Sequence, residues 1–312
     1  PDPLWSRGLG DVYKRQTCLL PEALCTAVPE PASIIPERKP PWVITALFCA
    51  SPLTSYGTQV YPAMPAALCV VLGVAGVTPG ASNRWSWVSV AMMICLPWLG
   101  IKYVPLALVL AIFLVWNHKD DPGVILKLQL FSLLFSGAMY LIIHQRIYGS
   151  WTVYATGDHF VDSEWAVVGN SPNYAGRTRR LLGLIVDRRF GIAAWTPVYL
   201  LVPLVVARTI RRRDQNWHIA ITLCAVGWAV ATWIALTMHG WWWSGRQIVP
   251  ILPVMAILFA TAVDQNRRRL QLVVAATLVG TFSWLWLVFP HVFPLKPLKK
   301  VSPLHFLPDF LS

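Results

Sequence analysis

Residues 181–209 place a charged cluster directly against an apolar stretch long enough to cross a bilayer. The cluster is Asp187, Arg188 and Arg189, and three further arginines follow the stretch. Charges at a membrane boundary are costly unless they meet solvent, a partner or a ligand headgroup. Pro197 interrupts the apolar run, and lipid tolerates such a break where neighbouring segments satisfy the freed carbonyl. This region therefore predicts a multi-pass membrane protein with its polar chemistry at one interface.

The composition of the whole chain agrees with this interpretation. Hydrophobic residues make up 56% and charged residues 13%, whereas soluble proteins have about 25% charged residues. The 17 tryptophans suit the headgroup region, which indole prefers. The formal net charge is +12, but the basic residues lie between apolar segments and form no basic domain. We therefore expect membrane lipids, and no nucleic acid, as partners.

The apolar segments predict an all-α transmembrane bundle of about eight or nine spans, since a bilayer core needs about 20 apolar residues in a helix. Pro65, Pro97 and Pro105 fall within three of the four short segments and make their boundaries weak. The predicted spans are 42–53, 63–77, 85–99, 103–116, 124–147, 191–210, 217–238, 247–263 and 270–289.

Basic residues recur at alternate ends of successive spans and define one cytoplasmic side. The opposite, outer side then carries the loop 148–190, in which 181–186 is expected to form a short interfacial helix. Long loops between spans are usually functional or disordered. The outer side is also rich in arginine and lysine, and binding an anionic group would explain this excess. We expect a multi-pass protein of the plasma membrane.

The N-terminal part differs from the rest of the chain. Residues 6–16, SRGLGDVYKRQ, resemble the translation of a sequencing adaptor, so we expect 1–16 to contribute nothing to the fold and the natural protein to extend further. The proline-rich segment 17–41 is either a connection or the remnant of an earlier span. The transmembrane domain then covers 42–290, and 291–312 form a tail.

Several local patterns, taken in order, resemble bacterial multi-pass glycosyltransferases of the GT-C superfamily. The branch in question includes the dolichyl-phosphate-mannose and aminoarabinose transferase types. The patterns are SPLTSYGTQVYPAMPAAL (51–68), LPWLGIKYVPLAL (96–108), RIYGS (146–150), GLIVDRRFGIAAWTPVYLL (183–201) and GWWWSGRQIVPILPVMA (240–256).

This resemblance implies transfer of a sugar from a polyprenyl-phosphate donor to an acceptor on the outer side of the membrane. The family carries its principal catalytic carboxylate in the first outer loop, near the chain start, which this sequence does not contain. Its members also often have an acidic residue where this chain has Ala63. The chain is therefore expected to be an N-terminally truncated glycosyltransferase.

Transfer from a lipid phosphate needs cations that stabilise the departing phosphate, and arginine suits this role because its planar fork makes two parallel bonds. The candidates for contact with the donor phosphate are Arg188, Arg189, Arg246 and Lys102. For each of them the alternative is interfacial anchoring by a snorkelling side chain.

Other residues are candidates to line the substrate cavity. Asp187 either fixes a phosphate-binding guanidinium or forms a structural salt bridge. Tyr56 and Tyr61 border the entry into the membrane. Trp241, Trp242 and Trp243 either stack on sugar faces or belong to an aromatic belt.

The run formed by Asp158, His159, Asp162 and Glu164 has ligand types that suit a divalent cation. A solvated acidic loop is the commoner explanation for such a run. The sequence predicts no other cofactor.

Phosphate-cradling glycine loops, zinc motifs and nucleophile elbows are missing from the sequence, which argues against a nucleotide-sugar enzyme. Two alternatives to a glycosyltransferase stay open, a transporter or lipid flippase and a non-catalytic scaffold. Transporters tend to carry charges at mid-span, whereas here the charges gather at the span ends.

Overall fold

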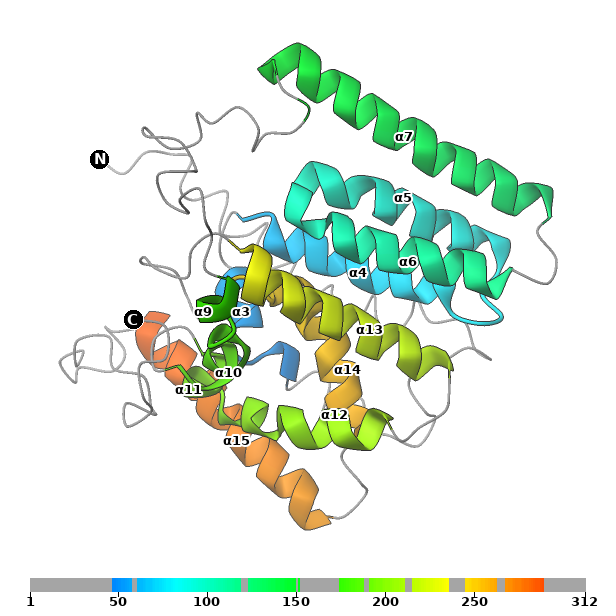
Figure 1. The fold of residues 1–312 in the computed structure, drawn as a ribbon. Coiled ribbons are helices and arrows are strands. Elements are labelled where there is room, and N and C mark those ends of the chain that lie inside the picture. Colours follow the sequence, from blue (N-terminus) through cyan, green and yellow to red (C-terminus); the bar gives the residue numbers. More distant parts are fainter. Residues whose placement is uncertain are drawn as a thin grey trace, which may run out of the picture.

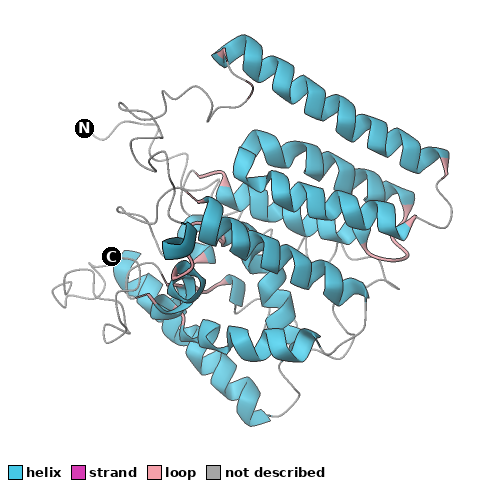
Figure 2. Cartoon of the chain, viewed as in Figure 1, coloured by secondary structure: helices cyan, strands magenta, loops and turns pink. Residues whose placement is uncertain are grey.

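The computed structural model describes residues 47–57, 61–118, 123–149, 151, 174–187, 191–210, 215–235, 245–262 and 267–288. The described part is helical and contains no strand (Figure 2). In chain order, the elements are α3 (Leu53–Gly57), α4 (Ala63–Val77), α5 (Asn83–Leu99), η1 (Ile101–Tyr103), α6 (Val104–Asn117), α7 (Val124–Tyr148), α9 (Tyr174–Arg177), α10 (Arg180–Val186), α11 (Ile192–Trp195), η3 (Pro197–Leu201), α12 (Val202–Ile210), α13 (Gln215–Ala229), the π-helical η4 (Val230–Ile234), η5 (Val249–Ile251), α14 (Leu252–Ala262) and α15 (Arg267–Val288).

Helices α4, α5 and α6 run antiparallel and pack side by side, and α7 lies beyond α5 and α6 (Figure 1). On the other side of this layer, α13 and α14 pack against α4 and α6, with α12 and α15 further out. The short helices α9, α10 and α11 gather at one end of the bundle. The expected all-α fold is confirmed for the described residues.

Two helical stretches, Val124–Tyr148 and Trp217–Ile234, are long and apolar enough to cross a membrane. In the described part of the chain, five further apolar stretches of 10–17 residues are shorter, among them Val273–Phe282 within α15. Membrane crossing by eight or nine segments therefore stays a prediction. The predicted span 42–53 is wrong in its described part, because a turn over residues 49–52 separates Phe48 from α3.

The prolines do not break the helices in which they lie. Pro65 lies in the first turn of α4 and Pro105 in the first turn of α6, where the missing N–H would have had no intrahelical partner. Pro97 lies within α5, close to its C-terminal end. In contrast, the predicted interruption at Pro197 is confirmed, because α11 ends at Trp195 and a 3₁₀ segment starts at the proline.

Small residues bring α4 and α5 into close contact. The Ser89 hydroxyl donates to the Gly73 carbonyl oxygen at 2.8 Å, and a Cβ atom built on Gly76 would lie only 2.1 Å from the Trp85 carbonyl oxygen. Glycine and serine at a helix interface allow the backbones to approach and to exchange hydrogen bonds, which is how helices associate in lipid.

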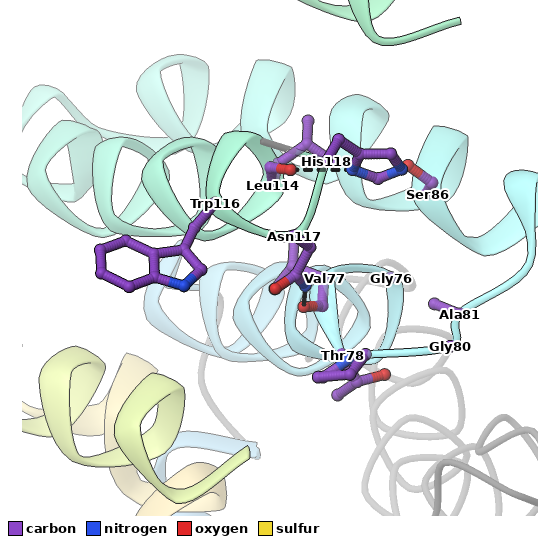
Figure 3. Close-up of a pocket in the computed structure, with 11 residues that line it drawn as sticks. Gly76, Val77, Thr78, Gly80, Ala81, Ser86, Leu114, Trp116, Asn117 and His118 are labelled. Atoms are coloured by element: carbon purple, nitrogen blue, oxygen red, sulfur yellow. Dashed lines mark hydrogen bonds between the residues drawn. The ribbon is translucent and has the colours of Figure 1, made fainter. Parts of the chain in front are cut away.

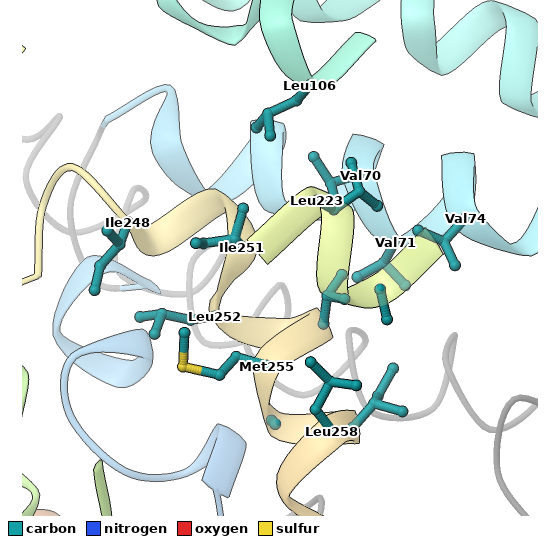
Figure 4. Packing of buried hydrophobic residues seen from close by; sticks show 14 of the residues in the cluster. Val70, Val71, Val74, Leu106, Leu223, Ile248, Ile251, Leu252, Met255 and Leu258 are labelled. Atoms are coloured by element: carbon teal, nitrogen blue, oxygen red, sulfur yellow. The ribbon is translucent and has the colours of Figure 1, made fainter. Parts of the chain in front are cut away.

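The core lies where α4, α13 and α14 meet. Val70, Val71 and Val74 of α4 face Leu223 of α13 and the side chains of η5 and α14 (Figure 4). Every described side chain from Val249 to Phe259 is buried. The core therefore holds η5, and the residues that immediately precede it, in a fixed position.

The ends of the helices form two groups. We call the "site end" the one that carries Tyr61, η1 and residues 245–247. At the opposite end, the last turns of α4 and α6 meet the start of α5 around a cavity of about 310 Å³ (Figure 3). There the Asn117 amide donates to the Val77 carbonyl oxygen, and an imidazole nitrogen of His118 lies 2.9 Å from the Leu114 carbonyl oxygen. Helices α4, α5 and α6 therefore alternate in direction between these two ends.

Candidate functional site

Three connections that are far apart in the sequence converge at the site end. Tyr61 directly precedes α4, Lys102 lies in η1 between α5 and α6, and Arg246 and Gln247 precede η5. The core packing of the adjoining helices positions each of them. The structure thus brings together Arg246, Lys102 and Tyr61, which the sequence had marked as separate candidates.

Arg246 is fixed against Tyr61 in two ways. Its Nε donates to the Tyr61 hydroxyl at 2.9 Å, and its second terminal nitrogen, Nη2, donates to the same oxygen. Its guanidinium carbon also lies 4.7 Å from the centre of the Tyr61 ring, within the range of a cation–π interaction. Arg246 is half-buried, so the fork is oriented at the edge of the packed region.

Lys102 approaches the same tyrosine from η1. Its Nζ donates to Oε1 of Gln247 at 3.2 Å, and it lies 5.7 Å and 5.2 Å from the ring centres of Tyr61 and Tyr103. Burial and the nearby charge of Arg246 lower the pKa of the Lys102 ammonium below its usual value. Arg246 thus disfavours the charged form of Lys102, and an anion bound beside the ammonium group would favour it.

Tyr56 completes the aromatic part of the site. It lies on α3, is buried, and its ring centre is 6.4 Å from that of Tyr61. Burial raises the pKa of the Tyr56 phenol, although the charge of Arg246 acts in the opposite direction. The phenol therefore stays protonated and keeps its capacity to donate a hydrogen bond.

Asp187 is buried directly after α10. Its carbonyl oxygen accepts a hydrogen bond from the Gly191 amide at 2.9 Å, and α11 starts at the next residue. A Cβ atom on Gly245 would lie 2.7 Å from Ile192 of α11, so the turn before Arg246 rests on this segment. The backbone at Asp187 therefore supports the segment on which the turn before Arg246 rests.

The remaining predicted site residues lie outside the described residues. These are Arg188, Arg189, Trp241, Trp242 and Trp243, together with the weak metal candidates Asp158, His159, Asp162 and Glu164. Within the described ranges, no group of three or more histidine, cysteine, aspartate or glutamate side chains is placed to hold a metal ion.

Sequence reasoning missed two residues of the site, Gln247 and Tyr103. Each adjoins a predicted residue, but a glutamine and a tyrosine at a span end carry no signal that separates them from ordinary interfacial residues. It also missed the role of Arg177 and Arg180. Arg177 donates to the Trp233 carbonyl oxygen at 2.6 Å, and Arg180 donates to that of Ala235 at 2.7 Å.

These two arginines satisfy the free carbonyls at the end of η4, where a helix leaves its last acceptors unpaired. Arg177 ends α9, and Arg180 begins α10 (Arg180–Val186), which covers the helix predicted at 181–186. The indole nitrogen of Trp228 donates to the Leu181 carbonyl oxygen at 3.2 Å. Part of the arginine excess on this side therefore ties α9 and α10 to the bundle.

No protein-family model, curated protein or solved structure matches this chain. The site gathers hydrogen-bonding groups at one end of an apolar bundle: a guanidinium group, an ammonium group, phenols and an amide. Such a set suits a singly or doubly charged oxyanion.

Proposed function

We propose that this chain is part of an integral-membrane glycosyltransferase of the GT-C type, and that its site end binds the phosphate of a polyprenyl-phosphate-linked sugar. One observation carries the proposal, the convergence of Lys102 and Arg246 on Tyr61 from separate connections. The pKa of Lys102 is lowered by burial and by Arg246, and perturbed groups of this kind gather at functional sites.

The position of the cations supports a lipid-linked ligand. They lie at one end of a bundle whose long helix α7 exposes large apolar side chains such as Phe131 and Leu134, as a lipid-facing helix does. A phosphate attached to a lipid would be delivered to this depth by its own hydrocarbon chain. The resemblance of the sequence patterns to GT-C enzymes adds the sugar and the direction of transfer.

Transport or flipping of a lipid-linked sugar is a second candidate, because the same cations would also bind a phosphate during translocation. The location of the cations favours transfer, since they gather at one end of the bundle and not at its middle. If the lipid binds at one side of the membrane and does not move between the leaflets, the chain acts in transfer and not in flipping.

The direct test is binding of a polyprenyl-phosphate-linked sugar to the whole chain in lipid nanodiscs. We expect saturable binding of the phosphosugar lipid and much weaker binding of the uncharged polyprenol. Arg84→Ala, which removes an exposed cation at the opposite end of α5, should leave the affinity unchanged. Equal binding of the polyprenol and the phosphosugar lipid would refute the proposed phosphate site.

The proposal also fixes which end of the bundle faces the outside. In a variant without native cysteines, Trp151→Cys should react with an impermeant thiol reagent added to intact cells, because it follows α7 at the site end and is exposed. Ser82→Cys, which is exposed at the opposite end, should react only after permeabilisation. Labelling of Ser82→Cys in intact cells would reverse the orientation and place the site inside.

Binding of the phosphosugar lipid is expected to weaken as the pH rises. A phosphodiester keeps its single negative charge over this range of pH. The pKa of Lys102 is lowered, so its ammonium group loses its proton at a lower pH than an ordinary lysine, whose pKa is about 10.4. The affinity is measured from about pH 7 to about pH 10, and the upper limit lies close to the pKa of an ordinary lysine. Lys102→Arg, which keeps its charge in this range, should flatten the profile. A flat profile for the unmodified chain would show that Lys102 does not contact the phosphate.

A further inference from the structure

An apolar slot, separate from the small cavity at Lys102, lies between α7 and the pair α5 and α6. Its volume is about 350 Å³. Among its lining residues, Ser136 is the only serine or threonine. Figure 1 shows α7 running along α5 and α6. The packing of small residues on both sides, including Gly137, Ala107 and Ala111, keeps the slot open.

Two contacts hold α7 in this position. Near the start of α7, the buried Gln129 amide donates to the Ser86 hydroxyl of α5 at 2.8 Å. Toward its end, the Tyr140 ring meets Trp98 of α5 edge-on, with centres 5.1 Å apart, and packs on His144 at 3.9 Å. The slot lies between these contacts, so its width is set by specific interactions at both ends of α7.

The size of the slot decides what kind of molecule fits it. A helix about 10 Å across occupies roughly 400 Å³ per turn, so no helix of a partner protein enters. An apolar cavity of about 150 Å³ takes up benzene, and the slot has more than twice that volume. A stretch of hydrocarbon chain of about a dozen carbon atoms fits it. Left empty, the lining side chains would lose their dispersion contacts on one side.

The position of the slot along α5 and α6 selects a lipid of one leaflet. Its lining residues on α5, Met93 to Trp98, and on α6, Val104 to Ala111, belong to the halves of these helices that lie toward the site end, and those on α7 lie around the middle of that helix. α7 has 25 residues, or about 37 Å of helix, so its ends reach the two headgroup regions of a core about 30 Å thick.

The lipid of the slot is distinct from the ligand of the cationic site. The Lys102 ammonium turns toward Gln247, and the small cavity beside it is lined by Leu106 of α6. The slot is lined by Val104 and Ala107 instead, which lie on another face of the same helix. A phosphate bound by Lys102 would therefore have to lead its chain around α6 to reach the slot.

We propose that this slot binds one acyl chain of a phospholipid of the leaflet at the site end, and that the chain joins α7 to the bundle. The proposal rests on the membrane placement made under the proposed function and not on sugar transfer. It therefore survives if the cationic site proves to bind no sugar lipid.

The test uses the whole chain in nanodiscs that contain a phosphatidylglycerol with a photoactivatable group on its acyl chain. After illumination, peptides from residues 93–111 and 133–141 should carry the label. Gly137→Leu should reduce this labelling several-fold, because a side chain at Gly137 meets no protein atom within 4 Å and would project into the slot. Gly123→Leu, also in open space at the start of α7, is the matched control and should label normally.

The smaller Gly137→Ala should give an intermediate result, and it covers the case in which the leucine variant does not fold. Labelling that is absent from these peptides, or that is the same in the Gly137 and Gly123 variants, would overturn the proposal. So would displacement of the label by an excess of polyprenyl phosphate, since the slot would then hold the chain of that lipid. Failure of the chain to enter nanodiscs would instead refute the membrane placement itself.

Discussion

Arg246→Ala is expected to weaken binding of a polyprenyl-phosphate-linked sugar about 10- to 100-fold, since a hydrogen bond to a charged group contributes about 1.5–3 kcal/mol. The guanidinium is already oriented by the Tyr61 hydroxyl, to which its Nε donates at 2.9 Å. Little conformational freedom is then lost when the phosphate binds. The measurement is the dissociation constant in nanodiscs for the unmodified chain and the variant.

Two further variants show how Arg246 acts. Arg246→Lys should restore only part of the affinity, because a point charge cannot reproduce the planar fork. Arg84→Ala serves as the matched control, since it removes an exposed arginine from the opposite end of the bundle. If Arg246→Ala stays folded, with an unchanged melting temperature, and binds the lipid like the unmodified chain, Arg246 is an interfacial anchor and has no phosphate role.

The same substitution should also affect catalysis in a longer enzyme of this type that carries the expected carboxylate. One preorganised donor contributes about 2–4 kcal/mol to transition-state stabilisation. The value of kcat/KM with a short-chain polyprenyl-phosphate sugar should therefore fall further than the affinity. An equal fall in both would mean that the arginine binds the ground state and the transition state alike.

How far the sequence predicts the site depends on the residue type. Arg246 and Lys102 are charged residues beside apolar spans, and such positions are costly enough to mark function. Their convergence on Tyr61 could not be predicted, because it depends on how three connections are placed by the packing of α4, α6 and η5. Gln247, which accepts the hydrogen bond of Lys102, is neutral and gave no signal.

The helix boundaries were predicted better than their interruptions. The predicted segment 63–77 coincides with α4, and 124–147 ends one residue before α7 does, because apolar runs and helices end at the same glycine and polar residues. Pro65 and Pro105 were expected to weaken their segments. They lie in the first turns of α4 and α6 instead. Whether a proline falls in a first turn or inside a helix depends on where the helix starts in the folded structure.

Local interactions of charged side chains were the least predictable part. Arg177 and Arg180 looked like a basic loop, yet they donate to backbone carbonyls at the end of η4. The sequence cannot show this, because the acceptors are peptide groups more than 50 residues away whose availability depends on where η4 ends. An arginine excess at one side of a bundle therefore includes structural arginines as well as ligand-binding ones.

Gly76→Ala is expected to destabilise the bundle by about 1–3 kcal/mol, the usual cost of overpacking a core, and the effect should lie at the upper end of this range. The new Cβ atom would lie 2.1 Å from the Trp85 carbonyl oxygen and 2.6 Å from the Ser89 Cβ atom. A backbone oxygen cannot rotate away as a side chain can, so α4 and α5 must move apart. That movement would stretch the hydrogen bond from Ser89 to the Gly73 carbonyl oxygen.

The measurement is the midpoint of thermal unfolding in one detergent, where a loss of this size lowers the melting temperature by several degrees. Gly137→Ala is the matched control, because it is the same substitution inside a helix but meets no atom within 4 Å. Alanine exceeds glycine in helix propensity by up to about 1 kcal/mol, so the control should be neutral or more stable. If both variants melt at the temperature of the unmodified chain, α4 and α5 are not in close contact. The position of Tyr61 before α4 would then have to be set by the core contacts of α4 with α13 and α14 alone.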